Sequence, residues 1–264
     1  INARPWATTI VFKADGNNSK QHIWNSGDGA STNDDNIYLI LDANRNLSFG
    51  WARSGSGLNE CEIASSISTS QWYGIYVAHK GARYSGSDAT ATNLANAFDI
   101  RVMSTGDSFA SVGASLSTSS NWTTTGNNMA TSIKGDFTIG GRGSNRNFHG
   151  KVASMVVTTL MINVDMPTDA EIKLMITDPV KWVTDYKVGN TFRYAESNSL
   201  GTFAINQNAS CFATQVWLMG DVESDSYSNG MRNYIQPYDQ NYTKLQLNSM
   251  QSNDMENVTI PGLS

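Results

Sequence analysis

Two carboxylates that could act as a pair are Glu60 and Glu62, which flank Cys61. Residues two apart in a β-strand share a face, so both side chains would point the same way if this stretch is extended. Paired carboxylates perform acid–base and nucleophilic chemistry on glycosidic bonds. No third carboxylate follows in residues 63–66, and acids on a surface or an edge strand show the same spacing. We therefore expect that this chain is not an enzyme.

Oxygen-bearing side chains gather in one polar stretch. Asp28, Asp34 and Asp35 lie there together with Asn33 and Asn36. Calcium prefers carboxylate and amide oxygens, and ligands at this spacing can converge on one ion. The alternative is that these residues form turns in a solvated loop. Calcium is the one cofactor that the sequence indicates, with the three aspartates as its candidate ligands.

The cysteines and histidines do not have the spacing of a metal site. Cys61 and Cys211 are far apart in the sequence, and His22, His79 and His149 each stand alone. Zinc ligands occur at short spacings such as C-x-x-C, which this chain lacks. A secreted disulfide scaffold would contain many more cysteines. We expect two separate buried thiols, and a disulfide between them stays open.

Four aromatic residues lie in or beside polar stretches: Trp24, Trp51, Tyr84 and Trp122. The apolar faces of pyranose rings stack on such side chains, while amides and carboxylates bind the hydroxyl groups. Trp122 is the best single candidate, because its sequence neighbours are an asparagine and three threonines. The alternative is that each ring anchors its loop onto the core. We take the four residues as candidates for glycan binding.

The elements that must position these residues are mainly β-strands. Short runs of β-branched and aromatic residues, bounded by Gly, Ser, Asn and Asp, are typical of strands. The predicted strands are 6–13, 36–42, 46–52, 71–79, 97–103, 136–140 and 151–161. Residues 42–46 predict a tight hairpin turn in which asparagine supplies the positive backbone angles. The predicted loops are 15–19, 25–35, 81–94 and 104–133.

One short helix is expected in residues 166–178. A proline suits its first turn, and Thr168 or Asp169 can cap its start. Ile172, Met175 and Ile176 form an apolar stripe that would pack on a sheet. An Asp-Pro pair then ends the helix.

Composition excludes several classes of protein. Ser, Thr, Asn and Gly make up 103 of the 264 residues, and only 16% are charged, so hydroxyl and amide groups must solvate much of the surface. The net charge of −5 leaves no basic surface for nucleic acid. No apolar run reaches the roughly 18 residues of a spanning helix, so no membrane insertion is expected. The chain begins at Ile1 rather than Met, and we interpret it as an internal or processed piece of a longer product.

The chain divides into two predicted regions. Residues 1–185 contain the main strands, and residues 186–264 form a β-rich extension or a small assembly module. Strand-like runs recur in the second region at 191–194, 213–219, 234–235, 244–249 and 257–261. The sequence leaves open whether these runs form a separate module or add strands to the first region.

Taken in order, the segments resemble a laminin G-like, concanavalin A-type jelly roll. The most distinctive part is Ile-Gly-Gly at 139–141, a variable loop and Phe-x-Gly at 148–150, followed by a strand. The other resembling segments are 9–13, 36–42, 47–51, 71–80 and 166–178, so the resemblance spans about two thirds of the chain. It implies an all-β sandwich. Its members include carbohydrate-binding modules, adhesion domains, glycosidases, polysaccharide lyases and viral structural proteins, so the fold does not fix the function.

Polysaccharide lyases of this fold use an arginine, a glutamine–histidine pair and a tyrosine close together. In this chain Gln21 and His22 are adjacent rather than spaced along a strand, and Tyr76 with Arg101 supplies no motif. A carbohydrate-active enzyme, either a lyase or a glycoside hydrolase, is therefore the alternative function. A carbohydrate-binding module of a secreted protein is a third possibility.

The C-terminal region resembles that of marine bacteriophage virion proteins which contain a laminin G-like domain. The resembling segments are 213–221, 225–229 and 252–264. This resemblance implies a structural or adhesive protein at the virion surface, as a capsid decoration, fibre or tail component. Its expected partners are other virion proteins, further copies of itself in a symmetric homo-oligomer, and cell-surface or environmental glycans. The alternative location is secreted.

The calcium hypothesis predicts a change in thermal stability. A cation that binds only the folded chain stabilises it, so a chelator is expected to lower the midpoint of thermal unfolding. The measurement is thermal unfolding with and without EGTA, with restoration by added calcium as the control. An unchanged midpoint would remove Asp34 and Asp35 from the candidate ligands.

Overall fold

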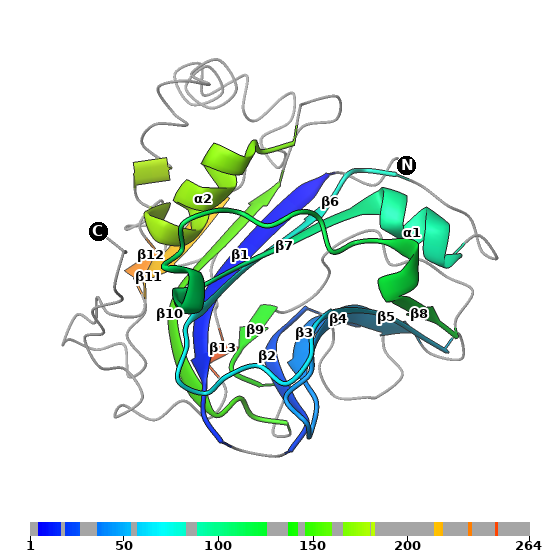
Figure 1. The fold of residues 1–264 in the computed structure, drawn as a ribbon, viewed down its shortest axis with the longest axis horizontal. Coiled ribbons are helices and arrows are strands. Elements are labelled where there is room, and N and C mark those ends of the chain that lie inside the picture. Colours follow the sequence, from blue (N-terminus) through cyan, green and yellow to red (C-terminus); the bar gives the residue numbers. More distant parts are fainter. Residues whose placement is uncertain are drawn as a thin grey trace.

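Two β-sheets stacked face to face make up the described part of the chain (Figure 1). The computed structural model describes residues 5–16, 19–26, 36–53, 57–82, 89–125, 137–141, 146–159, 166–179, 181–182, 214–218, 232–233 and 246–247. In spatial order, the six-stranded sheet consists of β12 (Arg232–Asn233), β11 (Thr214–Leu218), β10 (Gly150–Thr159), β1 (Trp6–Ala14), β6 (Tyr73–His79) and β7 (Phe98–Ser104). The seven-stranded sheet consists of β13 (Gln246–Leu247), β9 (Phe137–Ile139), β2 (Gln21–Ser26), β3 (Asn36–Leu41), β4 (Leu47–Arg53), β5 (Gly57–Ala64) and β8 (Trp122–Thr124).

The chain passes back and forth between the two sheets. β1 lies in the six-stranded sheet, β2 to β5 form most of the other sheet, and β6 and β7 return to the first. β8 and β9 then add to the seven-stranded sheet, and β10 pairs with β1. This topology is an all-β jelly-roll sandwich of the concanavalin A type, so the predicted fold class is confirmed.

The six-stranded sheet is buried on both faces. Ile10 and Phe12 of β1 face the seven-stranded sheet and belong to the main core. Ala7 and Val11 face the opposite way and belong to a second apolar cluster beneath α2 (Asp169–Thr177). Successive residues of a strand point to opposite faces, so a strand covered on both sides needs apolar residues in both sets. Double burial therefore explains the nearly continuous apolar sequence of β1.

α2 covers the outer face of the six-stranded sheet (Figure 1). It begins with a capping box: the Thr168 hydroxyl accepts a hydrogen bond from the Glu171 backbone N–H, and the Glu171 carboxylate accepts one from the Thr168 N–H. Ile172, Met175 and Ile176 are buried against the sheet. The predicted helix and its stripe are confirmed, although its proline lies before the cap and not in the first turn.

One carboxylate organises the hairpin between β3 and β4. Asp42 Oδ1 accepts hydrogen bonds from the backbone N–H groups of Asn44 and Asn46 at 2.7 and 2.9 Å, and Oδ2 accepts one from the Asn46 amide. The predicted turn is confirmed, but the positive φ of 63° falls on Arg45 and not on an asparagine. Asn46 instead uses its side chain, which also accepts a hydrogen bond from the Ser66 N–H.

Several elements lie where the sequence patterns predicted loops. α1 (Ala91–Ala97) lies largely in the predicted loop 81–94, while η2 (Thr105–Asp107), η3 (Ser119–Asn121) and β8 lie within 104–133. α1 has only seven residues, of which three are Thr or Asn and thus weak helix formers, and the Thr90 hydroxyl caps it by accepting a hydrogen bond from the Asn93 N–H. None of the described helices is long and apolar enough to cross a membrane.

Strands from the C-terminal third pair with both sheets. β11 pairs with β10 in the six-stranded sheet, and β13 pairs with β9 in the seven-stranded sheet, in parallel. These described strands are therefore appended to the sandwich. The domain boundary between residues 185 and 186 stays a prediction.

The close approach of α2 to β6 gives a stability prediction. A Cβ at Gly74 would lie inside van der Waals contact with the Ile176 side chain, so Gly74→Ala is expected to destabilise the fold by about 1–3 kcal/mol through overpacking. The matched control is Gly16→Ala, because nothing lies within 4 Å of a Cβ at that position. Urea unfolding of both variants measures the difference. Equal midpoints would contradict the tight packing of α2 on β6.

Candidate polar site on the seven-stranded sheet

A row of polar side chains crosses the outer face of the seven-stranded sheet, which is the face turned away from the core. Each strand from β9 to β8 contributes one residue, which is paired with the corresponding residue of the next strand. Adjacent strands in a sheet lie about 4.8 Å apart. We call this set the polar row, and its members are Thr138, Asn25, Tyr38, Gly50, Glu60 and Thr123. Every member except glycine offers a hydroxyl, an amide or a carboxylate on this face.

The adjacent ladder position faces inward and forms an apolar row. Its members are Ile139, Trp24, Leu39, Phe49, Cys61 and Trp122, all of which belong to the main core. Because strand residues alternate between faces, this register fixes which side chains fill the core and which line the outer face.

Two of the candidate glycan-binding residues, Trp24 and Trp122, belong to the apolar row and are buried in the core. Trp24 is 0% exposed and Trp122 is 5% exposed, and both rings contact Phe49, with centroids 6.2 and 6.3 Å apart. The Trp122 indole N–H also donates a hydrogen bond to the buried Ser117 hydroxyl at 3.0 Å. A ring without exposed surface cannot stack on a sugar. In this structure Trp24 and Trp122 are therefore core anchors, which is the alternative that the sequence left open.

A β-bulge makes the two rows possible in β2. His22 pairs with Ile40 and Trp24 pairs with Leu39, so Ile23 is the additional residue. Ile23 and Trp24 both enter the core, and the strand then presents Asn25 on the outer face opposite Tyr38. The bulge also breaks the period-two pattern, which is why the sequence did not predict β2 as a strand.

Tyr38 and Glu60 meet across Gly50. The two residues lie on β3 and β5, with β4 between them, and the Tyr38 hydroxyl donates a hydrogen bond to Glu60 Oε1 at 3.0 Å. A Cβ at Gly50 would lie 2.8 Å from Glu60 Cγ, so the absence of a side chain leaves room for this contact. Lys20 Nζ lies 4.0 Å from the same Oε1 atom. Glu60 thus has one oxygen held in place, which leaves Oε2 available as an acceptor.

The polar row is closed at one end and open at the other. Asn25 is 0% exposed and Tyr38 is 5% exposed, whereas the Glu60 side chain is 23% exposed and Thr123 is exposed. Both polar atoms of the Asn25 amide are buried without a hydrogen-bond partner. Buried polar groups are normally satisfied, so this amide is an exception to the rule.

His22 lies next to this closed end on the same strand. Its ring is 1% exposed and packs edge to face against Tyr38, with centroids 5.5 Å apart. The contact holds the Tyr38 ring, and therefore its hydroxyl, in one orientation relative to Glu60.

No protein family matches the sequence, and no curated protein does. Solved structures of similar fold include the CBM40 domain of the Ruminococcus gnavus IT-sialidase bound to α2,3-sialyllactose, with 15% identity and a TM-score of 0.34 over 66% of this chain and 84% of that one. A heptameric SAP-like pentraxin from Limulus polyphemus is 13% identical, with a TM-score of 0.32 over 66% and 70%. The LG4-5 domains of the mouse laminin α1 chain are 12% identical, with a TM-score of 0.34 over 64% and 40%. All three are concanavalin A-like jelly-roll structures.

The other predicted site residues lie outside what the structure describes. Tyr84, Asp28, Asp34 and Asp35 belong to undescribed stretches, and of Trp51 only the backbone pairing in β4 is described. Among the described residues, no group of three or more His, Cys, Asp or Glu side chains could hold a metal ion. These residues remain candidates for glycan and calcium binding.

Cys61 is a free thiol in the apolar row and is fully buried. Burial, with a smaller contribution from the charge of Glu62, raises its pKa from 9.0 to about 12. The thiol is therefore protonated at neutral pH and unreactive as a nucleophile.

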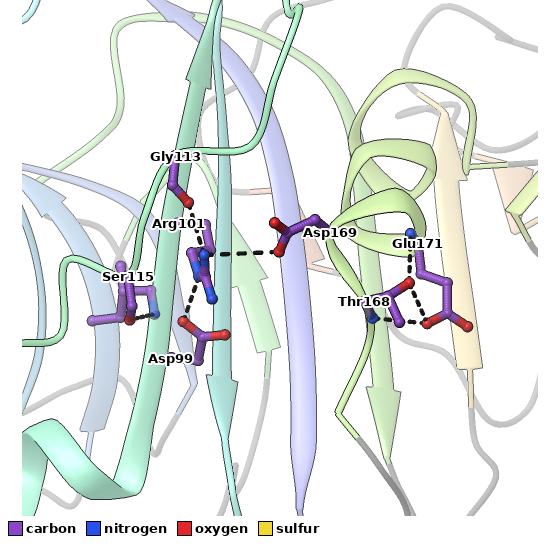
Figure 2. A network of polar contacts seen from close by, with 8 residues as sticks. Asp99, Arg101, Gly113, Ser115, Thr168, Asp169 and Glu171 are labelled. Carbon is purple, nitrogen blue, oxygen red and sulfur yellow. Dashed lines mark hydrogen bonds and ion pairs between the residues drawn. The ribbon is translucent and has the colours of Figure 1, made fainter.

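A second cluster of charged side chains lies on the other sheet, around Arg101 of β7 (Figure 2). The guanidinium Nε donates to Asp99 at 2.7 Å, Nη1 donates to the Gly113 carbonyl at 2.8 Å, and Nη1 lies 3.8 Å from Asp169 in the first turn of α2. The hydrogen bond to Asp99 and the nearby charges raise the pKa of Arg101, and partial burial opposes them. The cluster ties α2 and the segment after η2 to the sheet edge.

That segment covers the free edge of β7. The Leu116 N–H donates a hydrogen bond to the Ile100 carbonyl at 2.8 Å, and the Ser115 hydroxyl accepts one from the Ile100 N–H at 3.4 Å. These two bonds occupy backbone groups of Ile100 that an edge strand otherwise leaves unpaired, and the contact of the Arg101 side chain with Gly113 holds the segment in place.

The groups that a lyase would need are on different sheets. Gln21 and His22 lie on β2, and Gln21 Oε1 accepts a hydrogen bond from the His149 backbone N–H at 2.7 Å. Tyr76 and Arg101 are paired on β6 and β7 of the six-stranded sheet, where Tyr76 is buried beneath α2. Glu60 and Glu62 do lie on one strand, β5, as the sequence suggested, but Glu62 is exposed and Glu60 is bonded to Tyr38.

Proposed function

We propose that this chain is a non-catalytic glycan-binding domain and that the polar row is its contact surface. The observation behind this proposal is that the outer face holds one oriented, partly exposed carboxylate, Glu60, next to the exposed Thr123. Glycan sites present few, precisely held polar groups to the sugar, and Tyr38 holds the Glu60 carboxylate in this way.

The polar groups of the row match the chemistry of sugars. A sugar hydroxyl can both donate and accept a hydrogen bond, and the Glu60 carboxylate and the Thr123 hydroxyl offer matching groups at the exposed end of the row. Glu60 Oε2 can accept from a further hydroxyl without moving, because Tyr38 already holds the side chain. Trp51 and Tyr84 stay in the proposal as stacking platforms, and Asp28, Asp34 and Asp35 as calcium ligands.

Removal of the oriented carboxylate should weaken glycan binding. We expect Glu60→Ala to reduce the affinity for a bound hexasaccharide at least about tenfold, because it removes a charged acceptor. Tyr38→Phe should cause a smaller loss, since it frees the carboxylate without removing it. Binding of the full chain to immobilised hexamers of glucose, mannose, galactose, N-acetylglucosamine and uronic acids, followed by calorimetry, measures both effects.

The matched control is Asp169→Asn, which changes the net charge by the same amount on the helix that covers the opposite sheet. Its affinity should equal that of the unchanged chain. Binding that survives Glu60→Ala would refute the polar row as the contact surface. Binding to none of the hexamers, or release of shorter oligosaccharides from them, would refute the function itself.

We also propose that the domain acts at the surface of a phage particle, as a decoration, fibre or tail component in a symmetric oligomer. The resemblance of the C-terminal segments to phage virion proteins supports this context, and many copies on one particle would strengthen weak glycan contacts through multivalency. Mass spectrometry of purified particles from the source sample is expected to detect the chain at many copies per particle. Detection only in the secreted, particle-free fraction, as a monomer, would instead favour a module of a secreted protein.

A further inference from the structure

We infer that the polar row selects uncharged sugars and rejects glycans with carboxylate or sulfate groups. This inference rests on the proposed glycan-binding function and concerns its substrate class. The described charged side chains at the open end are the two carboxylates of Glu60 and Glu62 and the single ammonium of Lys20. An anionic sugar would meet more negative than positive charge there.

Among the described side chains at this end, Lys20 carries the one positive charge, and it is already engaged. Lys20 Nζ lies 4.0 Å from Glu60 Oε1, and the Lys20 side chain is 42% exposed, so water also solvates its charge. Recognition of a carboxylate or sulfate works best with a planar, two-pronged arginine contact. Arg101, which has this chemistry, is held by Asp99 on the other sheet and faces α2.

The closed end of the row offers neutral groups. The Asn25 amide has a donor and an acceptor, both without a partner, and Thr138 beside it uses its hydroxyl to donate to backbone carbonyl oxygens. Neutral groups give no compensation for burying an anion, which is costly without a paired charge.

Each carboxylate should therefore exclude anionic sugars by repulsion, in addition to accepting hydrogen bonds from neutral ones. Glu60→Gln keeps the shape of the side chain and removes its charge. Lys20→Ala leaves both carboxylates and removes the ammonium. The two variants should shift the selectivity in opposite directions.

The test compares two ligands that differ only at C6 of each ring, where one has a hydroxymethyl group and the other a carboxylate. β-1,4-linked mannohexaose and the corresponding hexamer of mannuronic acid have the same linkage and length, and calorimetry gives the ratio of their dissociation constants. The glucose, galactose and N-acetylglucosamine hexamers and 3′-sialyllactose, with lactose as its neutral partner, extend the comparison. Among the neutral ligands that bind, we expect each to have a dissociation constant at least about tenfold lower than that of its acidic partner at low ionic strength. Added salt should reduce this difference.

The variants identify the cause of the selectivity. Glu60→Gln and Glu62→Gln should each reduce the ratio several-fold, Lys20→Ala should increase it, and Asp169→Asn on the opposite sheet should leave it unchanged. Thermal unfolding of each variant verifies that it is folded. Equal or tighter binding of the acidic ligands by the unchanged chain would overturn the inference and leave glycan binding intact. Absence of binding to every neutral and acidic ligand would overturn the proposed function as well.

Discussion

The structure depends on the burial of the six-stranded sheet on both of its faces. β1 has Ile10 and Phe12 in the main core and Ala7 and Val11 beneath α2, and its backbone pairs with β10 and β6. Because this sheet is covered on its outer side by α2, the seven-stranded sheet is the one whose outer face is free to carry polar side chains. The difference between the outer faces of the two sheets, one apolar and one polar, follows from the packing of α2 on the six-stranded sheet.

The strands with a regular period of two were predictable from the sequence. β1, β3, β4, β6 and β10 appear close to their expected bounds, as does the hairpin at residues 42–46. β2 was not predictable, because its bulge puts two consecutive apolar residues into the core and thus imitates an irregular loop. α1 was missed because its Thr and Asn residues have low helix propensity, so its packing on η3 and β8 has to supply its stability.

The candidate site shows a different limit of sequence reasoning. Trp122 looked like a surface platform because its neighbours along the chain are polar, yet its neighbours in space are Phe49 and Phe98. Tyr38 and Glu60 are 22 residues apart, and their contact exists only because the strand register aligns them across Gly50. Glu60 could be recognised as a candidate from the sequence, whereas its hydrogen bond to Tyr38 depends on strand pairings that no local sequence pattern contains.

The covered edge of β7 limits how copies of this domain can associate. A free edge strand can recruit a strand from another molecule, which joins two sheets into one continuous sheet. The contacts of Ser115 and Leu116 already occupy the backbone N–H and carbonyl of Ile100, so a strand from another molecule could not pair there without displacing this segment. Neighbouring copies in an oligomer would therefore contact this edge through side chains and not through backbone pairing. The relative orientation of two copies could then change without any change in the strand pairing within each sheet.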